Sequence, residues 1–137
     1  MRRFIDIIWV AVLSAIVAIA LVSLVGLVAR AVLDVPDGFE PLDPAPLARL
    51  ALIAAIGATL VYWALISWNR TRGPQVFFWL SLVLLLVSLI GPLVVAPNDY
   101  PGIGAGPIAA LIVAHLAVFI PAAGLPLVLG AGGAIRD

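Results

Sequence analysis

The sequence predicts an all-α, polytopic membrane protein, an antiparallel up-down-up-down bundle of four transmembrane helices. Apolar residues make up 65% of the 137-residue chain and charged residues only 10%, against about 45–50% and 25% in soluble proteins. The charged residues are also clustered, and the clusters leave four long uncharged stretches. A soluble core of this size cannot bury so much apolar surface, so the bilayer is the predicted solvent.

The uncharged stretches locate the spans. They are residues 7–29, 50–69, 73–98 and 100–135. Each reaches the length of about 20 residues that crosses a hydrocarbon core. Pro and Gly shorten the last two stretches, so helices are expected at about 4–33, 46–69, 74–95 and 106–129. The length of the chain predicts that they form a single domain, 1–137. The first apolar run is longer than the ~7–15 residues of a signal peptide, so it is predicted to be retained.

Arginines indicate the orientation. Arg2 and Arg3 precede the first helix, and Arg70 and Arg72 lie between the second and third. Short loops that carry arginine stay in the cytoplasm, which predicts a multi-pass plasma-membrane protein with both termini cytoplasmic. Seven aromatic residues of the spans lie in the half of their helix nearest the same side of the membrane, as expected for an interfacial belt. These are Trp9, Trp63, Trp68, Trp79, Tyr62, Phe77 and Phe78.

Small residues predict how the helices pack. Lipid gives helices no hydrophobic reason to associate, so they meet where small side chains let the backbones approach. Such residues recur every fourth position in the first, second and fourth helices, as at Ala51 and Ala55. The third helix is instead Leu and Val from Leu82 to Val87. It is expected to be the most lipid-exposed helix or a dimer face.

His115 is the main candidate for an intramembrane polar site. It is the single histidine and lies about nine residues into the fourth predicted helix, ~13 Å from the helix start. Ionisable groups at such depth usually face the bundle interior. Three roles are open: a neutral histidine that hydrogen-bonds another helix, for instance at Ser88; a proton relay or ligand contact; and metal or haem ligation. Ser14 and Thr59, mid-span in the first two helices, complete the polar set.

Prolines interrupt the third and fourth predicted helices. Each removes a backbone hydrogen bond, which a membrane tolerates only where neighbouring groups compensate. Ser88 lies one turn before Pro92 and is a local candidate for this compensation. Pro92, Pro121 and Pro126 are therefore expected either to shape the bundle by kinks or to act as a gating hinge.

The first connecting segment predicts an outer layer of ion pairs. Arg30 and Arg49 flank it at the outer ends of two helices, and four carboxylates are spaced three residues apart between them. These are Asp34, Asp37, Glu40 and Asp43. A polyproline-like strand would separate them by about 9 Å, too far for neighbours to share one ion. A solvated acidic loop paired with the arginines is expected, and a cation-collecting mouth or a weak divalent-cation site is the alternative.

Several classes of function lack their residues. The chain has no Cys, which excludes disulfides, thiolate catalysis and cysteine-based metal sites. It has no lysine, so no basic face for nucleic acid is expected. No nucleophile–base pair or metal cluster is recognisable, and PGIGAGP (101–107) lacks the strand and lysine of a phosphate loop. No cofactor, metal or catalytic residue is predicted. Asp6 lies too near the start of its span to act as the mid-membrane carboxylate of a proton-coupled exporter.

Two segments carry a resemblance. The run LLLVSLIGPLVV in the third helix, followed by AALIVAHLAVFIPAAGLPL in the fourth, resembles a family of small four-helix membrane proteins of unknown function from archaea and bacteria. The family pattern has a Ser/Pro-containing third helix and a single histidine early in the fourth, which correspond to Ser88, Pro92 and His115. The resemblance implies the four-helix architecture and the choice of His115, and no mechanism.

The functional expectation is a non-enzymatic integral membrane protein, either a structural or accessory subunit of a larger membrane complex or a homo-oligomer. Its partners are then the lipid bilayer and other membrane helices. The alternative is a transporter or channel for a small solute or a proton, with His115 as the polar site. A membrane redox or enzyme subunit is a weaker alternative.

Overall fold

The computed structural model describes residues 2–33, 35–36 and 38–131, with side chains from residue 5 to residue 130 within these ranges. It contains α1 (Arg2–Val32), the 3₁₀ turn η1 (Glu40–Leu42), α2 (Pro44–Trp68), α3 (Gly73–Ser88), the π-helical turn η2 (Gly91–Val95), α4 (Ala96–Asp99) and α5 (Ala105–Ala131). The described part of the chain holds helices, turns and irregular segments only, so the all-α prediction is confirmed.

Four helices are long and apolar enough to cross a membrane. They are Ile5–Val32, Pro44–Trp68, Gly73–Asp99 and Ala105–Gly130. A chain with these four helices is a membrane protein, as the composition predicts. The third span continues through η2 and α4 to Asp99, beyond the end at residue 95 expected from the proline.

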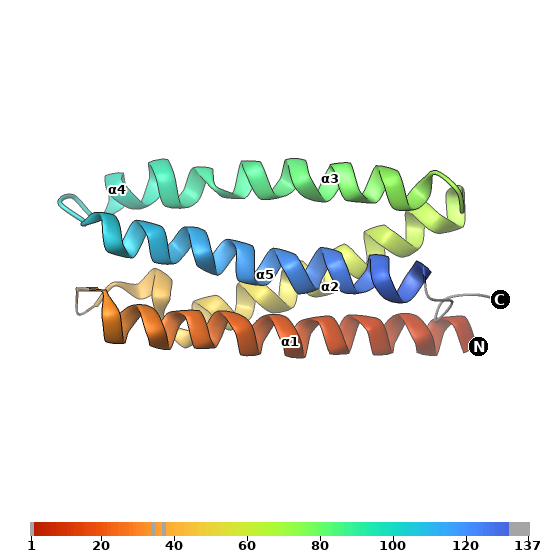
Figure 1. Cartoon of the computed structure of the whole chain (residues 1–137), viewed down its shortest axis with the longest axis horizontal. Helices are drawn as coiled ribbons and strands as arrows, with labels where there is room; N and C mark the ends of the chain where they lie inside the picture. The colour runs from red at the N-terminus through yellow and green to blue at the C-terminus, as the bar shows by residue number, and fades with distance from the viewer. Residues whose placement is uncertain (1, 34, 37, 132–137) are drawn as a thin grey trace.

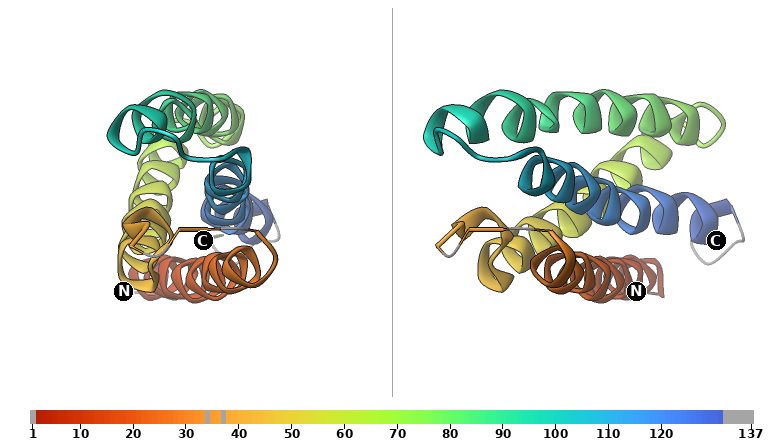
Figure 2. Two further views of the ribbon diagram at one scale, coloured as in Figure 1. Left: turned by 90° about the vertical axis from the view of Figure 1, so that its left-hand side faces the viewer. Right: turned by 60° about the vertical axis from the view of Figure 1, so that its left-hand side comes forward.

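Successive spans run in alternating directions along the long axis of the molecule (Figure 1). The start of α1, the end of α5 and the turn between α2 and α3 lie at one end of the bundle, here named the terminal end. The opposite end, here named the loop end, carries the segment that contains η1 and the turn between α4 and α5. Viewed along the bundle, α1 and α3 lie on opposite sides, with α2 and α5 between them (Figure 2).

Small side chains allow α1, α2 and α5 to pack closely. Ala18 on α1, Ala51 on α2 and Ala114 on α5 are fully buried and belong to one core cluster, together with Val22, Leu47 and Val118. Gly26 shows how close the approach is, because a Cβ there would lie 3.1 Å from Leu47 Cδ1. The alanine stripes recognised in the sequence therefore hold this chain's own helices together.

The third span is covered least by the rest of the chain. Only 11% of its most apolar 18-residue window is buried, against 33%, 22% and 44% for the first, second and fourth spans. It packs against α2 and α5 on one side (Figure 2). Its other side exposes large aliphatic side chains such as Val83, Leu86 and Val87. Of the four spans, the third is therefore the least buried within the chain, and its role as a lipid-facing helix or a dimer face stays a prediction.

A π-helical turn accommodates the proline of the third span. Pro92 has no N–H to bond the carbonyl one turn earlier. It lies within η2 (Gly91–Val95), after which the Ala96 N–H bonds Gly91 O, five residues earlier. The Ser88 hydroxyl instead donates to Leu85 O at 2.7 Å. The helix therefore continues past its proline by a local change of winding. The Ser88 side chain was expected to compensate for the backbone hydrogen bond lost at Pro92, but it bonds the Leu85 carbonyl, earlier in the same helix.

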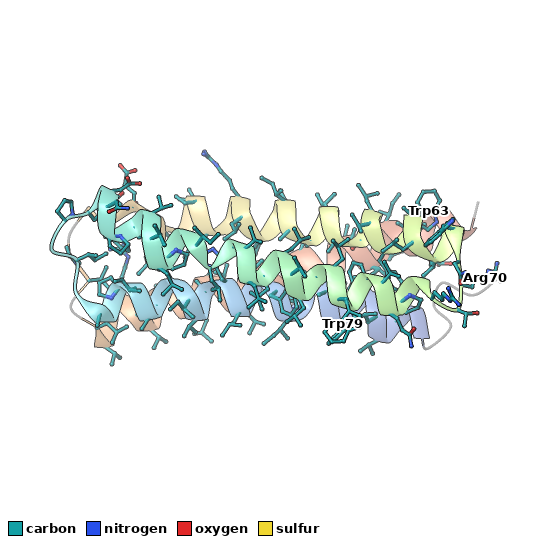
Figure 3. All side chains as sticks on the ribbon, turned by 90° about the horizontal axis from the view of Figure 1, so that it is seen from above. Trp63, Arg70 and Trp79 are labelled. Atoms are coloured by element: carbon teal, nitrogen blue, oxygen red, sulfur yellow. The ribbon has the colours of Figure 1, made fainter. Side chains whose placement is uncertain are left out.

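The two ends of the bundle are closed by different contacts. At the terminal end, Asn69 Oδ1 accepts hydrogen bonds from the N–H groups of Thr71 (3.0 Å) and Arg72 (2.9 Å), which shapes the turn into α3. At the loop end, the rings of Phe39 and Tyr100 meet edge to face with centroids 4.9 Å apart. Figure 3 shows Trp63 and Arg70 near the terminal end, with Trp79 further along the bundle.

Candidate functional site

A cavity of about 350 Å³ lies between α2, α3 and α5. Its walls are mostly apolar and include Phe77 and Phe119. Three polar side chains also line it: Ser81 and Ser88 from α3 and His115 from α5. His115 and Ser88, which the sequence suggests as hydrogen-bond partners, thus line one cavity but bond carbonyls of their own helices.

A second cavity, of about 290 Å³, lies at the loop end. Pro92, Asp99 and Tyr100 line it, together with the first turns of α2. His115 and Leu50 line both cavities. His115 is therefore placed where the loop-end cavity and the cavity between α2, α3 and α5 adjoin.

The hydrogen bond of His115 determines which of its two ring nitrogens carries the proton. Nδ1 lies 2.7 Å from the carbonyl oxygen of Leu111, one turn earlier in α5. Because a carbonyl only accepts, Nδ1 must carry the proton, and a neutral ring then has Nε2 as a free acceptor. Nε2 makes no hydrogen bond within the described part of the chain, and the His115 side chain lines the cavity. The bond to another helix expected for His115 is replaced by a bond within α5.

The two serines of α3 differ in how their hydroxyl groups are used. Ser88 donates to Leu85 O, so its oxygen keeps only acceptor capacity. Ser81 is only 8% exposed, and its hydroxyl has no partner among the described residues. Sequence reasoning did not single out Ser81. The sequence signal for Ser81 is its distance from Ser88. The two residues are seven positions, or two helical turns, apart and therefore share one face of the helix.

Ser14 and Thr59 do not join this site. Both are buried, Ser14 fully and Thr59 at 1% exposure, but neither lines the cavity. Thr59 donates to Ala55 O at 2.9 Å, within its own helix. Ser14 Oγ has no partner among the described residues. The four polar residues expected to form one intramembrane site are thus divided between the cavity and the interior of the bundle.

The prolines of α5 lie inside one continuous helix. Pro121 and Pro126 both fall within Ala105–Ala131, and both are buried. Pro92, in contrast, lies in η2 and lines the loop-end cavity. Of the three prolines expected to be kinks or hinges, Pro92 alone therefore coincides with a change of helix type among the described elements.

One ion pair of the expected layer is present at the loop end. Arg30 Nη2 lies 2.5 Å from Asp43 Oδ1 and 3.4 Å from the carbonyl oxygen of Phe39. Arg30 thereby ties the end of α1 to the segment that leads into α2. Glu40 and Arg49 are exposed and form no ion pair within the described ranges. Asp34 and Asp37 lie outside the described residues.

No group of three or more His, Cys, Asp or Glu side chains that could hold a metal ion occurs within the described part of the chain. His115 shares its cavity with serine hydroxyls and carbon atoms. The chemistry that these groups offer is therefore hydrogen bonding, with one nitrogen acceptor and two hydroxyl groups in an otherwise apolar space.

Residues 1–134 match the family of unknown function DUF6069. The chain belongs to this family. The resemblance seen in the third and fourth spans is thus confirmed as membership of a family of unknown function, in a protein whose four apolar helices fit a small membrane protein. No curated protein and no solved structure matches the chain. The features of this DUF6069 member that bear on its function are the cavity and the exposed third span.

Proposed function

We propose that this DUF6069 protein is a non-enzymatic membrane protein that works in an assembly, as an accessory subunit or as a homo-oligomer. One observation carries the proposal. The third span is only 11% buried along its most apolar window, while the other three are two to four times more covered. The outward side of α3 thus belongs to the span that the rest of the chain covers least.

The burial of the small residues inside the chain limits where a partner can bind. The alanines of α1, α2 and α5 that favour close helix approach are buried inside this chain, as at Ala18, Ala51 and Ala114. A partner must therefore contact other positions. Val83, Leu86 and Val87 on α3, and Ile90 just after it, are each more than half exposed and recur at helical spacing. They form a continuous stripe, here named the α3 stripe.

The proposed location is the plasma membrane, with both termini in the cytoplasm. Arginines at positions 2, 3, 70 and 72 belong to the terminal end. The four tryptophans of the spans are exposed, between 43% and 75%, and all lie in the half of their helix nearest that end. Exposed indole rings favour the headgroup level. Charge and aromatic placement thus support the same orientation.

Cysteine cross-linking tests the assembly, because the natural chain has no Cys. Leu86→Cys places a thiol in the α3 stripe, and Ile16→Cys places one on α1. Both side chains are 60% exposed, and both lie about 20 Å along their helices from the terminal end. In native membranes, a bifunctional maleimide should join Leu86→Cys to a second copy or to another membrane protein, and should leave Ile16→Cys largely uncoupled. Equal yields at the two positions, or a monomer without a partner by native mass spectrometry, would contradict the proposal.

The position of His115 favours a second candidate, a transporter or channel for a small solute or a proton. His115 lines both the loop-end cavity and the cavity between α2, α3 and α5. A path through the protein would pass this side chain. Liposomes that contain a pH-sensitive dye and the His115→Ala variant test the proton version. A proton flux equal to that of the natural protein would eliminate it.

A further inference from the structure

We propose that the cavity between α2, α3 and α5 binds a neutral lipid that carries a hydroxyl group. His115 Nε2 accepts the hydrogen bond of that hydroxyl, and Ser81 provides a second polar contact further along the cavity. This inference does not depend on the assembly proposed above, since it concerns the inner side of α3 and not the α3 stripe.

The cavity has the size and the opening that a ligand from the bilayer needs. Its volume of about 350 Å³ lies at the lower end of the range for small-molecule pockets. Ile53 on α2 and Leu84 on α3 line it, and these side chains are 72% and 58% exposed. The cavity is therefore open to the surroundings between α2 and α3. In a membrane those surroundings are lipid.

Two polar atoms in the walls lack a partner. Ser81 is more than nine-tenths buried, and its hydroxyl bonds nothing within the described part of the chain. His115 Nε2 is a bare acceptor, because Nδ1–H is committed to Leu111 O. In an apolar environment, an unpaired polar group is unfavourable. A ligand with a hydroxyl donor satisfies His115, and one with an oxygen acceptor satisfies Ser81.

Depth decides the class of lipid. His115 lies ~15 Å along α5 from its start at Ala105, and a hydrocarbon core is about 30 Å thick. The acceptor is thus near the middle of the bilayer. A phospholipid cannot bring its charged headgroup there without a large desolvation penalty. The walls of the cavity also carry no charged side chain to pair with such a group. The matching donor belongs to a lipid without a charged headgroup.

Photolabelling with two matched probes tests the proposal. One is a long-chain alcohol that carries a diazirine and an ether oxygen in its chain, so that it offers a donor to His115 and an acceptor to Ser81, and the other is its methyl ether, which has the same chain and no donor. The full-length protein, reconstituted in phosphatidylcholine liposomes, is labelled with each probe, and the modified peptides are mapped. The alcohol should label the α3 and α5 walls about three- to tenfold more than the ether, the ratio expected for one hydrogen bond.

Three variants give the specificity. His115→Phe keeps a ring and removes the acceptor, so the preference for the alcohol should disappear. Ser81→Ala removes one hydroxyl and should reduce alcohol labelling at least twofold. Ser14→Ala is the matched control, since Ser14 is also a buried serine without a partner but lies outside the cavity. It should label like the natural protein. If His115→Phe does not fold, the comparison of Ser81→Ala with Ser14→Ala decides.

If something other than a hydroxyl-bearing lipid occupies the cavity, the experiments give different results. Equal labelling by alcohol and ether would overturn the proposal and indicate a groove that holds only a hydrocarbon chain. Absence of labelling, with Ser81→Cys cross-linked to another polypeptide in native membranes, would also overturn it and indicate a partner helix. Loss of the alcohol preference in Ser14→Ala would contradict the assignment to the cavity. None of these outcomes affects the cross-linking test of the α3 stripe.

Discussion

Gly73 permits the tight turn between α2 and α3, and its replacement by alanine is expected to destabilise the protein. A Cβ at this position would lie 2.7 Å from Leu65 O, 2.9 Å from Leu65 C and 3.0 Å from Ile66 Cα. Ordinary carbon contacts are about 3.5–4.0 Å. All three atoms are backbone atoms of the preceding helix, so they cannot rotate away. Gly73→Ala must therefore move α3 relative to α2 by several tenths of an ångström.

The expected loss follows from two opposing terms. Overpacking of this kind costs about 1–3 kcal/mol, and Gly→Ala in a helix returns at most about 1 kcal/mol. The net loss in the free energy of unfolding lies between about 0 and 3 kcal/mol, with a centre of about 1–2 kcal/mol. Gly124→Ala in α5 is the control, because a Cβ there meets nothing within 4 Å. SDS-induced unfolding in mixed micelles, followed by far-UV circular dichroism, measures both. Equal stability of the two variants would refute the reasoning.

Further predictions concern the other contacts of the bundle. Arg30→Met removes the ion pair with Asp43 and should lower the free energy of unfolding by about 0.5–1 kcal/mol, a difference that shrinks when the same titration is run at high salt. Thr59→Val removes only a bond to Ala55 O within one helix and should change stability by less than about 0.5 kcal/mol; a larger loss would indicate an additional partner. Ala51→Leu inserts a branched side chain where exposure is 0% and should destabilise by about 1–3 kcal/mol, detected as a lower midpoint of thermal aggregation in detergent.

The candidate site was only partly predictable. His115 was recognised because an ionisable group in an apolar span is conspicuous, and its depth followed from helix geometry alone. Its partner was not predictable, since the choice between a carbonyl of its own helix and Ser88 depends on the rotation of α5. Ser81 was not predicted, because a single serine in an apolar helix gives no signal unless the neighbours of its helix face are known. The expected set that joined Ser14 and Thr59 to His115 divides for the same reason.

The sequence by itself determined the solvent, the number of spans and the use of small residues in packing. These features depend on composition and on residue order along one helix, and lipid as solvent leaves few alternatives for a chain with so little charge. Tertiary structure alone decided which faces meet. It buried the alanine stripes of α1, α2 and α5 against one another, left the third span at the edge, and formed a cavity beside His115 that is open between α2 and α3. Such choices depend on the rotation and tilt of whole helices, which are set by many weak packing contacts between segments far apart in the chain.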